Sequence, residues 1–160
     1  MRCLVPLLLT LCGLSARGEV LEGRVVAITD GNTLTLLDSN RHQHKIRLAG
    51  IDAPELSQPY GTRSRLRLSN LAFGKDARAD CYNVDRYGGD VCTVYVHGKD
   101  IGLAQLNAGL AWWYRKYAHE QLPRDRMSYE SAEDRAAADR LGLWQDKNPT
   151  PPWEWRQEHR

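Results

Sequence analysis

The sequence predicts an α+β fold, in which five short strands close into a small β-barrel with about three helices interspersed among them. Two observations indicate this class. The first half of the chain contains short runs rich in β-forming residues, separated by tight-turn residues. The later segments show helical spacing with capping residues at their ends. With 160 residues, 42% hydrophobic and 26% charged, the chain is long enough to bury one core.

The first segment, residues 1–18, is expected to be a signal peptide. A basic start is followed by an apolar run too short to span a bilayer, and then by small residues up to Gly18. A buried N-terminal helix is the alternative, but Pro6 and the short length argue against it. A lipid anchor at Cys12 is less favoured, because Leu11 is a poor neighbour for it. The mature protein is therefore expected in the periplasm or the medium, with no further membrane span.

Strands come next, within a domain that is expected to span residues 19–147. Turns at Asp30-Gly31-Asn32 and at Asp38-Ser39-Asn40 separate three strands, and two more follow the first helix. The predicted strands are 20–29, 33–37, 45–49, 81–84 and 91–96. The short connections between the first three predict a meander.

Three helices are predicted. The first is basic and spans 62–73, with Leu66, Leu68, Leu71 and Ala72 as its apolar stripe and Arg63, Arg65 and Arg67 on its wet side. The second begins after the capping residue Asp100 and ends before Gly109, and the third runs from Ser128 to Arg140. Residues 148–160 are read as a Pro/Trp-rich extension that adheres to the domain.

Charge and cysteine counts narrow the function only slightly. Without Arg2 and Arg17 the mature chain carries 20 basic and 20 acidic residues, so bulk charge does not predict nucleic-acid binding. Cys81 and Cys92 remain after export, and an even pair in an exported chain favours a disulfide. Two free buried thiols are the alternative, because a cross-strand bridge needs specific geometry.

Three polar clusters are candidates for chemistry. They are Asp30-Gly31-Asn32-Thr33, the segment from Arg47 to Glu55, and Asp85-Arg86-Tyr87-Gly88-Gly89-Asp90. In the second cluster, Asp52 with oxygens from the first turn suits a hard cation, Arg47 suits a phosphate, and Glu55 suits a water. On spacing alone, a surface Arg–carboxylate pair and two ordinary turns are the commoner interpretation.

Taken together and in order, the three clusters resemble the staphylococcal (thermo)nuclease family. Asn107-Ala108-Gly109-Leu110-Ala111 and Leu141-Gly142-Leu143-Trp144 match it as well, so the resemblance spans roughly Glu22 to Asp146. It implies an OB-like five-stranded β-barrel with three helices. It also implies Ca²⁺-dependent cleavage of DNA and RNA.

The resemblance assigns roles to individual residues. Arg47 matches a catalytic arginine that contacts the scissile phosphate, and Glu55 a catalytic glutamate that positions or deprotonates the attacking water. Asp52 matches a calcium ligand, and Ala53 stands where a backbone carbonyl binds the ion. The residues implied for nucleotide or phosphate binding are Arg86, Tyr87 and Tyr117.

Two positions depart from the family pattern. Asn32 stands where a second calcium-binding aspartate is expected, which keeps an oxygen ligand but removes a negative charge. Gly89 stands where a second catalytic arginine is expected; arginines that act on phosphoryl groups are worth about 10³–10⁵ in rate. Another arginine nearby would have to compensate.

The leading hypothesis is therefore an exported, Ca²⁺-dependent nuclease that acts as a monomer on DNA, RNA or both. The alternative is a nuclease-fold module that binds nucleic acid with weak or no catalysis, as Asn32 and Gly89 suggest. A barrel for protein or sugar partners ranks last, because it makes all three clusters coincidental. The five histidines have no metal-ligand spacing, which argues against zinc.

Overall fold

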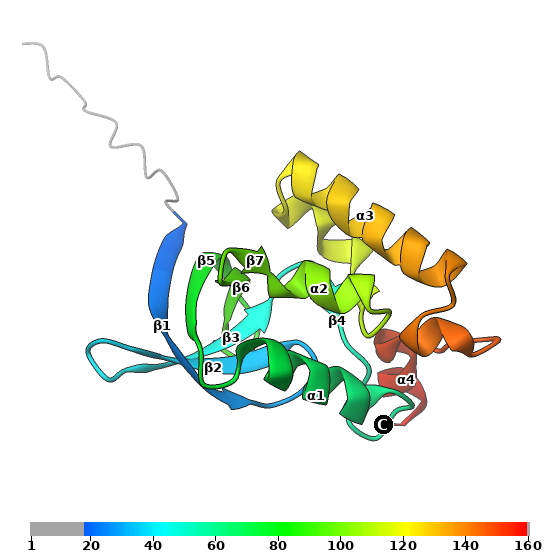
Figure 1. Cartoon of the computed structure of the whole chain (residues 1–160), viewed down its shortest axis with the longest axis horizontal. Coiled ribbons are helices and arrows are strands. Elements are labelled where there is room, and N and C mark those ends of the chain that lie inside the picture. The colour runs from blue at the N-terminus through cyan, green and yellow to red at the C-terminus, as the bar shows by residue number, and fades with distance from the viewer. Residues whose placement is uncertain (1–17, 160) are drawn as a thin grey trace, which may run out of the picture.

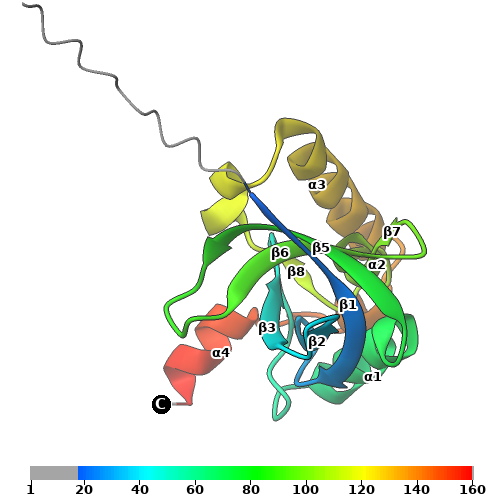
Figure 2. The same cartoon turned by 90° about the vertical axis from the view of Figure 1, so that its left-hand side faces the viewer.

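Residues 18–159 are described by a computed structural model, whose main feature is a closed, mixed β-barrel (Figures 1 and 2). Its strands follow the order β3-β2-β1-β5-β6, and parallel pairing of β3 with β6 closes the ring. The five strands are β1 (Glu19–Ile28), β2 (Thr33–Asp38), β3 (Gln43–Leu48), β5 (Asp76–Val84) and β6 (Asp90–Val96). The predicted α+β class with a five-stranded barrel is confirmed.

Helices and short strands surround this barrel. The α-helices among the described residues are α1 (Gly61–Ala72), α2 (Ile101–Asn107), α3 (Pro123–Ala138) and α4 (Pro152–Glu158). Two 3₁₀ helices are η1 (Arg115–Glu120) and η2 (Gly142–Gln145), and the remaining strands are β4 (Ile51–Asp52), β7 (Lys99–Asp100) and β8 (Trp112–Trp113). Figure 1 shows α3 lying over α2, while α4 sits at the far end from the β1 strand. The prediction of about three helices thus omitted α4.

The core lies between the barrel and the helices. Side chains alternate across each strand, so β2 and β3 point every second residue inward. The inward residues of these strands, Leu34, Leu36, Ile46 and Leu48, are almost fully buried. The helices add Leu68, Ile101, Leu106 and Tyr129 to the same core.

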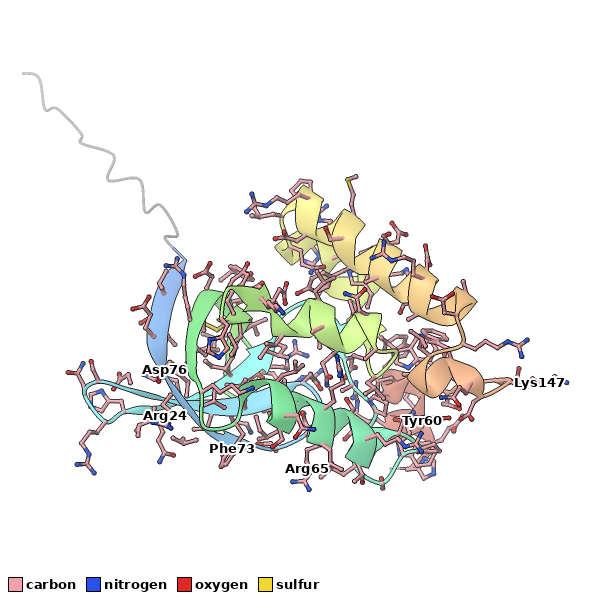
Figure 3. All side chains as sticks on the ribbon, viewed as in Figure 1. Arg24, Tyr60, Arg65, Phe73, Asp76 and Lys147 are labelled. Atoms are coloured by element: carbon pink, nitrogen blue, oxygen red, sulfur yellow. A yellow bond between two sulfur atoms is a disulfide. The ribbon has the colours of Figure 1, made fainter. Side chains whose placement is uncertain are left out.

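The predicted apolar stripe of α1 is partly wrong. Leu66 is 52% exposed, whereas Gly61, Ser64, Leu68 and Ala72 are buried. Ser64 belongs to the buried face because its hydroxyl donates a hydrogen bond to the backbone oxygen of Leu110, 2.6 Å away. The arginines remain on the outer side, and Arg65 points away from the barrel (Figure 3).

Two elements begin five residues earlier than predicted. Helix α3 begins at Pro123 rather than at Ser128, because proline suits a first helical turn that lacks N–H partners. Ser128 lies inside the helix, and its hydroxyl donates to the Arg124 carbonyl at 3.0 Å. Strand β5 begins at Asp76 instead of Cys81, and only its alanines, Ala77 and Ala79, face the core before that point.

Cys81 and Cys92 form a disulfide between β5 and β6. The two residues face each other in the antiparallel register of this hairpin. The predicted signal peptide, apart from Gly18, lies outside the described residues. Among those described, no helix has the length and apolar character that a membrane crossing requires.

Candidate active site

A polar pocket of about 430 Å³ brings the three predicted clusters together. The first cluster contributes the turn before β2, the second the end of β3 and the loop after it, and the third the tip of the β5–β6 hairpin. Arg156 of helix α4 lines the pocket too. The residues that line it are Thr29, Asp30, Asn32, Thr33, Lys45, Arg47, Asp52, Glu55, Asn83, Val84, Asp85, Arg86, Tyr87, Gly89, Val91, Tyr114, Tyr117 and Arg156.

The first turn is fixed against the helices. The Gly31 carbonyl accepts a hydrogen bond from Nε2 of buried Gln105 at 2.8 Å, and a Cβ at Gly31 would collide with Ser64. Glycine is therefore required where the turn meets α1. Burial raises the pKa of the Asp30 carboxyl, although its hydrogen bond from the Asn32 backbone opposes the shift.

The same turn contacts the second cluster. The Ala53 backbone N–H donates to Oδ1 of buried Asn32 at 3.2 Å. The Asn32 side chain therefore contacts the residue that directly follows Asp52 in the chain. This places amide, carboxylate and backbone oxygens of two distant segments at one end of the barrel.

Arg47 occupies the point at which the barrel closes. In β3 it pairs with Thr33 of β2 on one side and with Val91 of β6 on the other. Its Nε is buried and has no hydrogen-bond partner among the described residues; the nearest carboxylate oxygen, from Asp85, is 3.9 Å away. A buried guanidinium N–H without a partner is costly unless an anion completes it.

Asp52 is held by a second, two-stranded sheet. It pairs with Trp112 as β4 meets β8, after Gly50 has turned the chain with a φ of 72°. Its carboxylate is buried, and desolvation raises its pKa. The hydrogen bonds and the charge of Arg156 oppose that shift.

Arg156 bridges the two acidic residues of the second cluster. Its Nη2 donates to Oδ2 of Asp52 at 2.7 Å, and its Nη1 donates to Oε1 of Glu55 at 2.7 Å and to Oδ1 of Asp52 at 3.3 Å. Asp52 is buried, whereas the side chains of Glu55 and Arg156 are about two-fifths exposed. The guanidinium therefore lies at the mouth of the pocket and neutralises the carboxylates beneath it.

The third cluster forms a closed loop at the hairpin tip. Oδ1 of Asp85 accepts hydrogen bonds from the backbone N–H groups of Tyr87 and Gly89 at 2.8 and 3.0 Å. The Arg86 guanidinium lies 5.7 Å from the centroid of the Tyr87 ring, which is 81% exposed. Gly89 is buried against the Lys45 carbonyl and Asp85. This loop offers exposed contacts for a chain lying across the pocket.

Tyr117 reaches the pocket from η1, on the opposite side. Its ring centroid lies 6.0 Å from the Arg47 guanidinium carbon and 5.0 Å from the ring of Tyr114. Trp113 of β8 is buried instead, with its indole N–H bonded to Gln121. The aromatic segment 112–117 therefore divides between core and pocket.

The oxygen donors present suit a hard cation in chemical type, since Asp52, Asn32 and the Ala53 carbonyl share one end of the barrel. Each carboxylate oxygen of Asp52 already accepts a hydrogen bond from Arg156, so an ion bound there would compete with the guanidinium for these oxygens. Within residues 18–159, no group of three or more His, Cys, Asp or Glu side chains is placed to hold a metal.

The structure thus gathers the predicted residues of the three clusters around one pocket. Sequence reasoning did not anticipate Arg156, because nothing in the composition of a proline- and tryptophan-rich tail indicates where its arginines lie. Lys45 was also not singled out for this site. Only the fold brings these residues together.

Comparison with known proteins places the chain among nucleases. Residues 45–146 match the family model described as "Staphylococcal nuclease homologue". The chain is 42% identical over 144 residues to a protein of Shigella flexneri named "Micrococcal nuclease", covering 84% of this chain and 80% of that protein. It is 39% identical over 137 residues to an "Uncharacterized endonuclease" of Haemophilus influenzae, covering 86% and 74%. An "Uncharacterized endonuclease" of Escherichia coli O157:H7 is 34% identical over 98% of both chains.

Proposed function

The chain belongs to the staphylococcal nuclease family, and from this premise we propose that it is a nuclease that hydrolyses phosphodiester bonds of DNA, RNA or both as a monomer. The buried Nε of Arg47, which has no hydrogen-bond partner within the described residues, carries this proposal. Arg47 and Glu55 line the same pocket, so an anion bound by Arg47 lies in the same pocket as a carboxylate that can act as a base. A phosphodiester oxygen is an acceptor that satisfies such a guanidinium.

The proposed reaction is in-line attack of water at phosphorus. Glu55 orients the water and accepts its proton as the new P–O bond forms, while Arg47 binds the phosphoryl oxygens. The opposite P–O ester bond breaks, and its oxygen leaves and takes up a proton. The exposed ring of Tyr87 and the half-buried ring of Tyr117 offer stacking surfaces for bases, and Arg86 a contact to the backbone.

We also propose that the nuclease is Ca²⁺-dependent, with Asp52, Asn32 and the Ala53 carbonyl holding the ion. Bound calcium would supply charge neutralisation at the phosphoryl oxygens. Because Asn32 adds no charge, the affinity is expected to be lower than that of a site with two aspartates.

Glu55→Gln tests the function. We expect turnover of plasmid DNA and single-stranded RNA to fall by about 10²–10⁴, because the amide cannot accept the proton of water. Cutting is measured with Ca²⁺ and with EDTA. The matched control is Glu130→Gln, which makes the same change on the exposed side of α3. Full turnover by Glu55→Gln would remove Glu55 from the mechanism.

A protein that retards nucleic acid without cutting it would instead be the binding module that Asn32 and Gly89 suggest. Cutting that is indifferent to EDTA would contradict the calcium dependence alone.

Export is a further part of the proposal. The features of residues 1–18 support it, and so does the disulfide, since such bonds persist in oxidising compartments. Cell fractionation with mass measurement of the N-terminus tests it. A full-length chain in the cytoplasmic fraction would contradict export.

A further inference from the structure

Arg156 lines the pocket, but the proposed mechanism gives it no role. Its guanidinium has five N–H groups, and the bonds to Asp52 and Glu55 engage three of them. The other two N–H groups, one on Nε and one on Nη2, have no hydrogen-bond partner within residues 18–159 and lie beside the pocket. A guanidinium can therefore hold the acidic residues and a phosphate at the same time.

The charge of the pocket lining favours this use. Its acidic residues are Asp30, Asp52, Glu55 and Asp85, and its basic residues are Lys45, Arg47, Arg86 and Arg156. Without Arg156 the acidic residues outnumber the basic ones. The excess negative charge would then repel an anionic phosphodiester next to Glu55. Arg86 would not offset this repulsion, because it lies at the exposed hairpin tip against Tyr87. Arg156 is the cation that contacts Glu55 itself.

Helix α4 holds this arginine in place. The ring of Trp153 stacks on Tyr114 with centroids 5.2 Å apart and meets Trp112 edge-on at 5.8 Å. Nε2 of Gln58 donates to the Thr150 carbonyl at 2.6 Å just before the helix. These contacts fix α4 on the barrel end, three and six residues before the arginine that enters the pocket.

We propose that Arg156 is a catalytic residue of this nuclease that binds the substrate phosphate opposite Arg47. The proposal rests on the proposed function. Gly89, at the hairpin tip, has no side chain to offer, so the second guanidinium comes from a helix that follows the whole barrel in the chain. The competing explanation is that Arg156 only neutralises Asp52.

The first test measures binding without catalysis. The full chain binds a fluorescein-labelled single-stranded oligonucleotide in EDTA, and anisotropy gives the affinity over a series of salt concentrations. For Arg156→Gln we expect the slope of log K against log[salt] to shrink by about 0.7, since one phosphate contact is lost. Arg124→Gln is the control: it removes the same charge from an exposed site on α3, so its slope should match the wild type.

The second test measures turnover. Arg156→Gln is expected to lose about 100-fold in kcat, as when one transition-state donor is removed. Added guanidinium chloride should restore part of this loss and should not restore Glu55→Gln. Arg156→Lys should keep the salt slope but lose turnover, because lysine lacks the two-pronged geometry.

The outcomes separate the two proposals. If the wild type does not cut, the proposed function fails, and the salt slope still decides whether Arg156 contacts phosphate. If the wild type cuts while Arg156→Gln matches it in slope and turnover, Arg156 is only a counter-ion and the inference is overturned. Should Arg156→Gln fail to fold, by its melting curve, Arg156→Lys decides: unchanged turnover overturns the inference.

Discussion

Asp52 is the residue at which burial, ion pairing and the proposed metal binding meet. Its carboxylate is buried between β8 and the pocket, and Arg156 bonds to both of its oxygens. A buried carboxylate requires a compensating charge, and both a guanidinium and a divalent ion can supply it. In the proposed calcium site, Arg156 and the ion would therefore compete for the same oxygens.

This competition predicts that Arg156→Gln binds calcium more tightly. We expect the Kd for Ca²⁺ to fall by about tenfold, which corresponds to about 1.4 kcal/mol for the ion pair that need no longer be broken. Calorimetric titration of the metal-free protein measures it. Arg124→Gln serves again as the charge-matched control. Equal affinities in wild type and Arg156→Gln would show that the ion does not displace the guanidinium.

At the scale of elements, α2 illustrates how one capping side chain fixes the start of a helix. Oδ1 of Asp100 accepts hydrogen bonds from the backbone N–H groups of Gly102 and Leu103, and Oδ2 accepts one from the Tyr129 hydroxyl at 2.8 Å. The cap therefore joins the start of α2 to α3. Burial raises the pKa of this carboxyl, although the three hydrogen bonds oppose the shift.

The raised pKa gives Asp100→Asn a pH signature. A carboxyl with a higher pKa in the folded state than in the unfolded chain binds its proton more readily when folded. Its contribution to stability therefore decreases as pH rises from about 4, the unfolded value, through the raised pKa. Asparagine keeps a capping oxygen without titrating.

We accordingly expect the free energy of unfolding of the wild type, relative to Asp100→Asn, to fall between about pH 4 and neutral pH. Urea unfolding across this range measures it. A difference that grows with pH, or stays constant, would contradict the raised pKa.

Elements with strong local signals could be predicted from the sequence. The Asp30-Gly31-Asn32 turn and the Asp100 cap placed β2 and α2 within one residue of their observed bounds. The prediction was wrong where tertiary contacts determine which residues are buried. In α1, Ser64 lies on the buried face and Leu66 does not. In β5, Ala77 and Ala79 extend the strand into a stretch with charged neighbours. Small residues that contact the core contribute little to the hydrophobic periodicity of a sequence, so the pattern does not reveal them.

For the whole molecule, the pocket depends on segments far apart in the chain. Asn32 meets Ala53, Arg47 pairs between β2 and β6, and Arg156 contacts Asp52 across 104 positions. The motif residues could be predicted because each cluster is local. Arg156 could not, because its position depends on how Trp153 packs against Tyr114.

The segment that joins α4 to the barrel domain can be cut by a protease at Lys147. This lysine lies in an exposed bend between η2 and α4, and Figure 3 shows it projecting from the edge of the molecule. Exposed bends of this kind are preferred sites of proteolytic nicking.

A single cut after Lys147 would leave the barrel continuous but would turn the docking of α4 into an association between two separate molecules. The covalent link gives a tethered segment an effective concentration on the order of millimolar, which a free peptide loses on dilution. We expect oligonucleotide binding by the nicked protein to weaken as it is diluted, while the intact protein shows no such dependence; identical dilution curves would mean that the contacts of Trp153 and Thr150 hold α4 without the chain.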